Sequence, residues 1–159
     1  MPSPGAKNTV KQLIQKAVRL KVKAKQDKNP YDAVWLFFDN DNQPGLKDVF
    51  RKLKLLDIKI AYSSISIEHL FVLHLENIRT PFANSDETLR KIKPLWRSHF
   101  NSDYHKTTIK HFEKLKENLD TAVKRAEQIR KQAEKDGIPI EERNPYFTIP
   151  DLISYFTSL

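Results

Sequence analysis

The sequence of 159 residues contains no cysteine, which excludes disulfide bonds and thiolate nucleophiles. Only three glycines are present, too few for the glycine-rich loop with which P-loop proteins cradle phosphate. The five histidines show no metal-binding spacing, and there is no zinc pattern or Ser-His-Asp arrangement. Any catalysis by this chain must therefore use other side chains.

Long hydrophobic runs are also missing. No apolar stretch approaches the roughly 20 residues of a membrane-spanning helix, and the N-terminus lacks the apolar core of a signal peptide. We therefore expect a cytoplasmic protein with no membrane segment. A hydrophobic content of 39% over this length fits one domain with a real core. Residues 1–8, rich in Pro, Gly and Ser, are predicted to be disordered, and residues 9–159 to form a single domain.

Negative charge is scarce, with 20 acidic against 28 basic residues and a net charge of +8. Most of the surplus lies in residues 1–29, which hold eight basic residues and one acidic residue. Such a segment attracts phosphate backbones without reading sequence, which makes nucleic acid the expected partner. The alternative is a solvated helix face that only keeps the protein soluble. The candidate nucleic-acid-binding residues are Lys11, Lys16, Arg19, Lys21, Lys23, Lys25 and Lys28.

A βαβ unit is predicted between residues 33 and 62. Residues 33–38 form an unbroken apolar run, too short for a helix and typical of a buried strand. Leucine, valine and phenylalanine then recur at helical spacing over residues 46–56, and residues 58–62 form a second short strand. Strands joined by one helix run parallel, so both carboxyl ends lie on one edge of the sheet.

The remaining chain is predicted to be mostly helical. Thr9 and Gln12 have the spacing of a capping box and start a helix that ends near residue 25. The fold class is therefore α/β, with a small parallel sheet, flanking helices and a helical C-terminal half. Further elements are predicted as a helix over residues 67–76, a short helix over 85–93 within an otherwise irregular 77–101, a long helix over 102–135, a loop over 138–147 and a last helix over 148–159.

Acidic side chains gather where these strands end. Asp39 and Asp41 follow the first strand, and Glu68 lies in the first turn of the helix after the second. Such carboxylates suit Mg²⁺ (or Mn²⁺), which usually takes one or two of them together with water and phosphate oxygens. We therefore expect the three to act together as metal ligands and catalytic residues, with Ser63 and Ser64 binding phosphate at the helix N-terminus.

Structural roles compete with each of these assignments. Asp-Asn-Asp before Pro-Gly is also ordinary turn chemistry, in which the side chains bond their own backbone. Glu68 can simply favour the start of its helix. His74 is a candidate for hydrogen-bonding one of the metal ligands. Because it lies in an apolar helix, the alternative is a hydrogen-bonded histidine of the core.

The order of these segments resembles the RloB family, a TOPRIM-related group associated with bacterial phage defence. The matching pieces are VWLFFDND at residues 34–41, IAYSS at 60–64, the glutamate and histidine of the next helix, and Asn144-Pro145 before a closing helix. The TOPRIM pattern opens with a further strand that ends in glutamate, whereas this sequence starts with the helix that follows it. The serine turn also departs from the family, with Ile65 and Leu70 where relatives have other residues.

The resemblance implies a magnesium-dependent nuclease in anti-phage defence, with an ATPase encoded alongside as partner. The competing hypothesis is a non-catalytic subunit with a degenerate metal site, which binds nucleic acid or the ATPase through the basic helix. Without a leading strand, the edge of the first strand needs a cover. We expect either a homodimer or the N-terminal helix, through Val10, Leu13, Ile14 and Val18.

Overall fold

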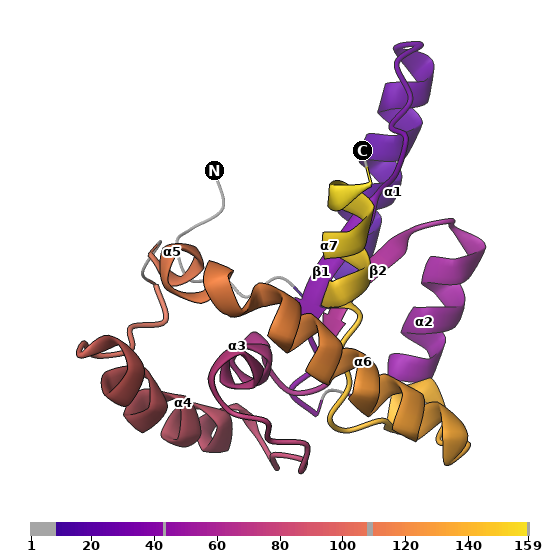
Figure 1. Ribbon diagram of the computed structural model, residues 1–159. Coiled ribbons are helices and arrows are strands. Elements are labelled where there is room, and N and C mark those ends of the chain that lie inside the picture. The colour runs from indigo at the N-terminus through magenta and orange to yellow at the C-terminus, as the bar shows by residue number, and fades with distance from the viewer. Residues whose placement is uncertain (1–8, 43, 108–109, 159) are drawn as a thin grey trace.

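The computed structural model describes residues 9–42, 44–107 and 110–158, and the predicted disorder of residues 1–8 lies outside them. Its centre is a parallel pair of strands, β1 (Trp35–Asp39) and β2 (Lys59–Ser63), joined by α2 (Leu46–Leu55). The register runs from Trp35 opposite Lys59 to Asp39 opposite Ser63. The predicted α/β class and its βαβ unit are thus confirmed (Figure 1).

Helices make up most of the rest. They are α1 (Val10–Gln26), α3 (Ile67–Leu75), α4 (Ser85–Phe100), α5 (His111–Leu115), α6 (Leu119–Lys135) and α7 (Ile149–Thr157), with single 3-10 turns η1 (Lys116–Asn118) and η2 (Ile140–Glu142). In the described part of the chain, no helix combines the length and apolar character that crossing a membrane requires.

The two faces of the sheet bury different helices because side chains alternate along a strand. Leu36, Phe38 and Tyr62 share a core with residues of α1 and α2, including Ile14 and Leu53. On the opposite face Ala61 packs with residues of α3, α6 and α7. Each strand therefore contributes to two cores, and the short sheet is enclosed by helices on both sides.

Two predicted helical regions are wrong in their extent. Helix α4 does not stop near residue 93 but continues through Pro94 to Phe100. Proline lacks a backbone N–H, yet Pro94 lies on the solvent side of α4, while Ile92 and Trp96 are buried. Burial of these two side chains stabilises the helix on both sides of Pro94.

The predicted helix over residues 102–135 is interrupted. Asn101 ends α4 in the left-handed conformation, and residues 102–107 form bends and turns instead of a helix. Tyr104 in this segment is 6% exposed and packs against Trp96, with ring centroids 5.3 Å apart. Tertiary burial of one aromatic ring thus replaces the helical turn that the charge pattern favoured.

The segment before α7, predicted as a loop, completes the outer edge of β2. Phe147 forms an antiparallel bridge with Ser63. Thr148 adds two side-chain hydrogen bonds, accepting from the Tyr62 N–H at 2.9 Å and donating to the Ile60 carbonyl at 2.8 Å. This edge of the sheet is therefore paired within the chain.

The opposite edge, along β1, is paired with no other strand of the described residues. The N-terminal helix was predicted to cover this edge, but the same residues pack on the sheet face: Ile14 is buried there, and Val10, Leu13 and Val18 contact the same core. Phe37 remains 51% exposed on β1. Cover of this edge by a second copy of the chain stays a prediction.

Docking of α1 depends on its buried stripe, so Ile14→Ala is expected to destabilise the protein by roughly 2–4 kcal/mol. The matched control is Leu20→Ala on the same helix, where the side chain is 39% exposed and the expected loss is well under half as large. Denaturant unfolding followed by circular dichroism measures both. Equal losses would show that the face assigned to the core is wrong.

Candidate functional site: a carboxylate cavity

A cavity of about 420 Å³ opens at the edge where both strands end. Asp39 is the last residue of β1, and the next residue, Asn40, donates its backbone N–H to the Ser63 carbonyl at 3.0 Å. Parallel pairing therefore brings the end of β1 beside the start of α3. The cavity is lined by Val10, Leu13, Phe37, Phe38, Asp39, Asp41, Ile65, Ser66, Ser85 and Lys106.

Asp39 carries the strongest electrostatic perturbation in this cavity. Its pKa is raised from 3.8 to about 6, chiefly by burial and to a smaller extent by the negative charges of Glu68 and Asp41. The backbone N–H of Ile67 and the ammonium of Lys106 oppose this rise by stabilising the anion. Its Oδ1 is buried and has no hydrogen-bond partner among the described residues. An ionised carboxylate in this position favours the approach of a cation.

Glu68 is the most deeply buried acid at the site, with a side chain 1% exposed. Its Oε1 accepts a hydrogen bond from the Tyr104 hydroxyl at 3.3 Å and pairs with Lys106 Nζ at 3.2 Å. Its Oε2 is buried without a partner in the described chain. Glu68 lies in the first turn of α3, where the helix dipole favours a negative charge.

Asp41 lies at the rim and has a different environment. Its carboxylate accepts hydrogen bonds at 3.2 Å from both the backbone N–H and the hydroxyl of Ser85, the first residue of α4. Asp41 thus links the turn after β1 to the start of α4. In the alternative role the side chain would bond the backbone of its own turn, whereas these bonds go to Ser85, 44 residues away, and both carboxylate oxygens are already engaged.

The donor set fits a cation held by two carboxylates. Among the residues that the structure describes, no three or more His, Cys, Asp or Glu side chains lie together closely enough to hold a metal ion. Asp39 and Glu68, however, each keep one buried oxygen without a partner. One or two carboxylates are the usual protein contribution to Mg²⁺, so the pair fits and a shared three-carboxylate site stays a prediction.

The serine residues need a correction. Ser64 is engaged elsewhere, since its hydroxyl donates to Asn144 Oδ1 at 3.3 Å and accepts from the Tyr146 N–H at 3.0 Å. Ser63 is fully buried and does not line the cavity. Ser66 does line it, with a buried hydroxyl that has no partner among the described residues. Ser66 was missed because the preceding pair of serines carried the family resemblance.

Lys106 and Tyr104 were missed for a different reason. Both lie nearly forty residues after Glu68, in a segment whose composition predicts a helix. Only the turn at residues 102–107 carries them to the Glu68 carboxylate. No spacing rule in the sequence relates the two segments.

His74 has the structural role that was its alternative, that of a hydrogen-bonded core histidine. Its Nδ1–H donates to the Leu70 carbonyl at 2.9 Å within the same helix, and burial lowers its pKa. The ring lines an apolar groove of about 380 Å³ between α3, α5, α6 and α7 instead of the carboxylate cavity. No hydrogen bond joins His74 to Asp39, Asp41 or Glu68, so the predicted support of a metal ligand by this ring is not made.

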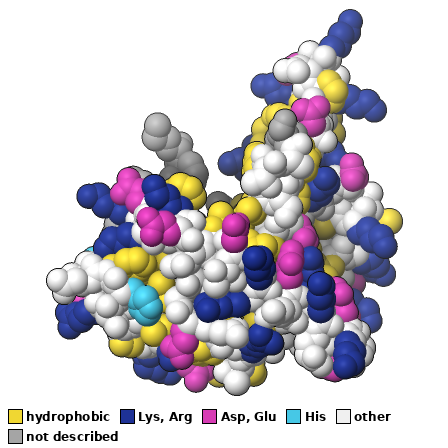
Figure 2. All heavy atoms as spheres, viewed as in Figure 1, with side chains coloured by type: hydrophobic (Ala, Val, Ile, Leu, Met, Phe, Trp, Pro, Cys, Tyr) yellow, Lys and Arg dark blue, Asp and Glu magenta, His cyan; other side chains and the backbone are white. Residues whose placement is uncertain are grey.

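The C-terminal end of α1 projects from the rest of the molecule (Figure 1), and this end with the residues that follow it is called the α1 arm. Figure 2 shows lysine and arginine side chains along this arm. Among the predicted basic residues, Lys21 is already engaged within the protein, because its ammonium donates at 2.9 Å to the carbonyls of Leu56 and Asp57, at the end of α2. The other predicted basic residues, Lys11, Lys16, Arg19, Lys23, Lys25 and Lys28, are exposed.

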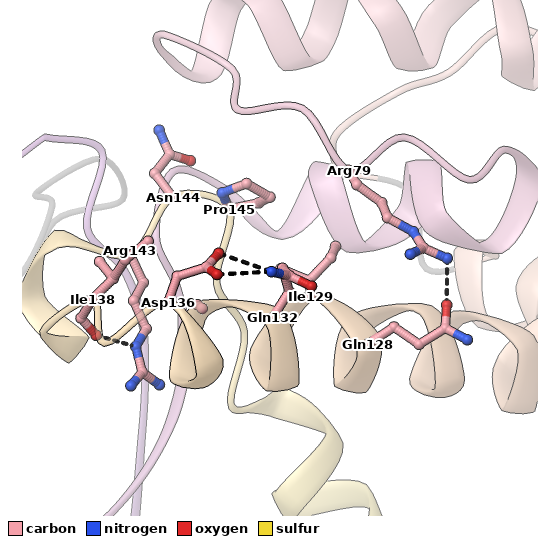
Figure 3. A pocket seen from close by; sticks show the side chains of 10 residues that line it. Arg79, Gln128, Ile129, Gln132, Asp136, Ile138, Arg143, Asn144 and Pro145 are labelled. Atoms are coloured by element: carbon pink, nitrogen blue, oxygen red, sulfur yellow. Dashed lines mark hydrogen bonds between the residues drawn. The ribbon is translucent and has the colours of Figure 1, made fainter.

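A separate polar pocket of about 180 Å³ lies beside the C-terminal half of α6. Figure 3 shows that its polar side chains bond within the pocket: Arg79 to Gln128, Gln132 to Asp136, and Arg143 to the Ile138 carbonyl. Because these groups satisfy one another, the pocket offers less to a ligand than the carboxylate cavity does.

Fold and site together define a small α/β protein with a carboxylate cavity at the carboxyl edge of its parallel strands. A family model described as RloB-like protein matches residues 1–156, and the chain belongs to that family. Neither the curated proteins nor the solved structures contain a match to this chain.

The raised pKa of Asp39 predicts a pH-dependent stability in metal-free buffer. Well below pH 3.8, the ordinary pKa of an unfolded aspartate, the carboxyl is protonated in both states and makes no difference. As the pH rises towards 6, the unfolded chain loses this proton first, so the folded state is increasingly disfavoured. Asp39→Asn removes this cost and is expected to stabilise the protein by roughly 2–3 kcal/mol at pH 8 but by only about 0.5 kcal/mol at pH 4.

Denaturant unfolding at both pH values, with a chelator present, measures the difference. Asp48→Asn is the matched control, because that side chain is 78% exposed and its substitution should change stability little at either pH. A stabilisation by Asp39→Asn that stays constant from pH 4 to pH 8 would contradict a buried, ionising Asp39.

Proposed function

We propose that this protein is a Mg²⁺- or Mn²⁺-dependent nuclease that hydrolyses phosphodiester bonds in nucleic acid. The observation that carries the proposal is the pair of buried, unpartnered carboxylate oxygens on Asp39 and Glu68, at one edge of the sheet. Leaving charged oxygens buried without partners is unfavourable, and a bound cation relieves that cost. Strand carboxyl ends are also where α/β sheets bind ligands.

Each of these acids has a role in this proposal, although Glu68 does not line the cavity and lies beside it, paired with the lining residue Lys106. Asp39 and Glu68 would hold the ion, which supplies a more acidic water and charge stabilisation at the phosphate. Ser66 precedes α3 and offers its hydroxyl to a phosphate oxygen beside the helix N-terminus. Asp41, held by Ser85, adds negative charge at the rim. It adds a ligand if its side chain turns inward.

Nucleic acid is the proposed substrate partner, and the α1 arm is its proposed contact. The net charge of +8 and the exposed basic residues of the arm favour a polyanion over a neutral or cationic substrate. Membership of the RloB-like family supports the proposal of a cytoplasmic role in anti-phage defence, with an ATPase encoded alongside as a second partner.

One observation favours the second candidate function, a non-catalytic nucleic-acid-binding or ATPase-partner subunit. Lys106 already neutralises Glu68 at 3.2 Å, as expected if an ammonium had taken the place of a metal ion. The two functions differ in metal binding, since only the nuclease requires it.

Metal titration separates the two candidates. We expect isothermal calorimetry at pH 8 to show one Mn²⁺ bound per chain, with affinity reduced at least about tenfold in Asp39→Asn and Glu68→Gln because each loses an anionic ligand. Cleavage of single-stranded and duplex RNA and DNA should be lost in the same variants and abolished by chelator. Asp48→Asn, remote from the cavity, is the control. A protein that binds nucleic acid but neither binds metal nor cleaves would support the regulatory subunit.

The arm predicts a salt-dependent affinity for nucleic acid. Reversing the charges of Lys23, Lys25 and Lys28 is expected to weaken binding and to flatten the plot of log affinity against log salt, by roughly 0.7–0.9 for each phosphate that the arm no longer neutralises. Fluorescence anisotropy over a salt series measures the slope. The matched control reverses three exposed lysines of α6, Lys124, Lys131 and Lys135. An equal effect from both triples would mean that only net charge matters.

A further inference from the structure

Lys106 occupies an unusual position for an exposed lysine. Its side chain is 59% exposed, yet its ammonium lies 3.2 Å from Oε1 of Glu68, whose side chain is 1% exposed. It also lines the cavity that contains Asp39 and Asp41. The mostly exposed side chain of Lys106 therefore places its ammonium against the most buried acid of the site.

Three carboxylates and one lysine ammonium set the charge balance around the cavity. Asp39, Asp41 and Glu68 lie near enough for the two other carboxylates to raise the pKa of Asp39, and Lys106 is the cation that acts against them. No other lysine or arginine pairs with these acids among the described residues. Without Lys106, no side-chain cation of the described residues would oppose the repulsion among the three carboxylates, which would be left to neutral hydrogen-bond donors.

The attachment of Lys106 is also readily reversible. It reaches the site from the turn at residues 102–107, and within the described part of the chain its one ion pair is with Glu68. Tyr104, in contrast, is buried in the same segment and keeps its own hydrogen bond to Glu68 Oε1. The backbone can therefore stay anchored by Tyr104 while the lysine side chain swings into solvent.

We propose that Lys106 is an exchangeable internal cation, which balances the carboxylates in the metal-free protein and is displaced from Glu68 by a bound divalent ion. The inference rests on the metal site of the proposed function. An ion held at Asp39 Oδ1 and Glu68 Oε2 would place two positive charges beside the ammonium on Glu68 Oε1. Repulsion from the ion would then drive the ammonium into the solvent that already reaches its side chain. The displaced ammonium stays at the cavity rim, within reach of a phosphate oxygen of the substrate.

Metal affinity tests the competition with a readout independent of cleavage. Mn²⁺ binding at pH 8 is measured by calorimetry for the wild type, Lys106→Met, Lys106→Arg and the control Lys110→Met, an exposed lysine four residues further on. Loss of the competing charge is expected to tighten Mn²⁺ binding about tenfold in Lys106→Met. Lys106→Arg and Lys110→Met should bind as the wild type does.

Chemical labelling of the unaltered protein tests the displacement itself. Ion pairing protects an amine from acylation, so the labelling rate of Lys106, followed by mass spectrometry, should rise severalfold when Mn²⁺ is added. Lys110 in the same digest should label at an unchanged rate. This experiment needs no substitution and so does not depend on the folding of a variant.

The outcomes distinguish the two levels of the proposal. If neither the wild type nor Lys106→Met binds Mn²⁺, the proposed metal-dependent function fails. If Mn²⁺ binds equally or more weakly to Lys106→Met, or if Lys106 labelling does not change with Mn²⁺, the exchange is overturned while the metal site stands. Weaker binding in Lys106→Met would instead make this lysine a support that positions Glu68.

Discussion

Parallel pairing of β1 with β2 is the constraint on which the site depends. The pairing sets Asp39 opposite Ser63, so the end of one strand lies beside the turn that leads into α3. Glu68 follows in the first turn of that helix. An antiparallel pair would have placed these residues at opposite ends of the sheet. The single crossover through α2 is therefore what brings the acids to one edge.

A sheet of two strands cannot bury its own faces, so helices cover both faces and a later segment pairs with one edge. Helices α1 and α2 cover one face and α3, α6 and α7 the other. Phe147 and Thr148 close the outer edge of β2 with backbone and side-chain hydrogen bonds. The edge of β1 is left unpaired within the described residues, beside the cavity and the exposed ring of Phe37.

Electrostatics at the cavity oppose the stability of the fold. Burial and mutual repulsion raise the pKa of Asp39, so its ionised form costs folding free energy at neutral pH. Glu68 is more deeply buried but is compensated by the Tyr104 hydroxyl, the Lys106 ammonium and its place in the first turn of α3. Asp39 and Glu68, at the same edge, thus differ in how far hydrogen-bond donors and positive charge compensate their negative charge. Carboxyl groups in a cleft with a pKa raised in this way occur preferentially at functional sites.

The sequence by itself determined the βαβ unit and the edge that carries the acids, because apolar runs and helical spacing are local signals. The predicted strand at residues 33–38 is found as β1 (Trp35–Asp39), the Thr9 capping box is formed, and the family model confirms the family resemblance. Only the tertiary structure decided which polar groups face the cavity. Lys106 and Tyr104 reach Glu68 because burial of the tyrosine ring bends a segment with a helical pattern, and Ser64 is taken up by the distant Asn144 and Tyr146. Contacts between segments so far apart depend on packing, which no local spacing encodes.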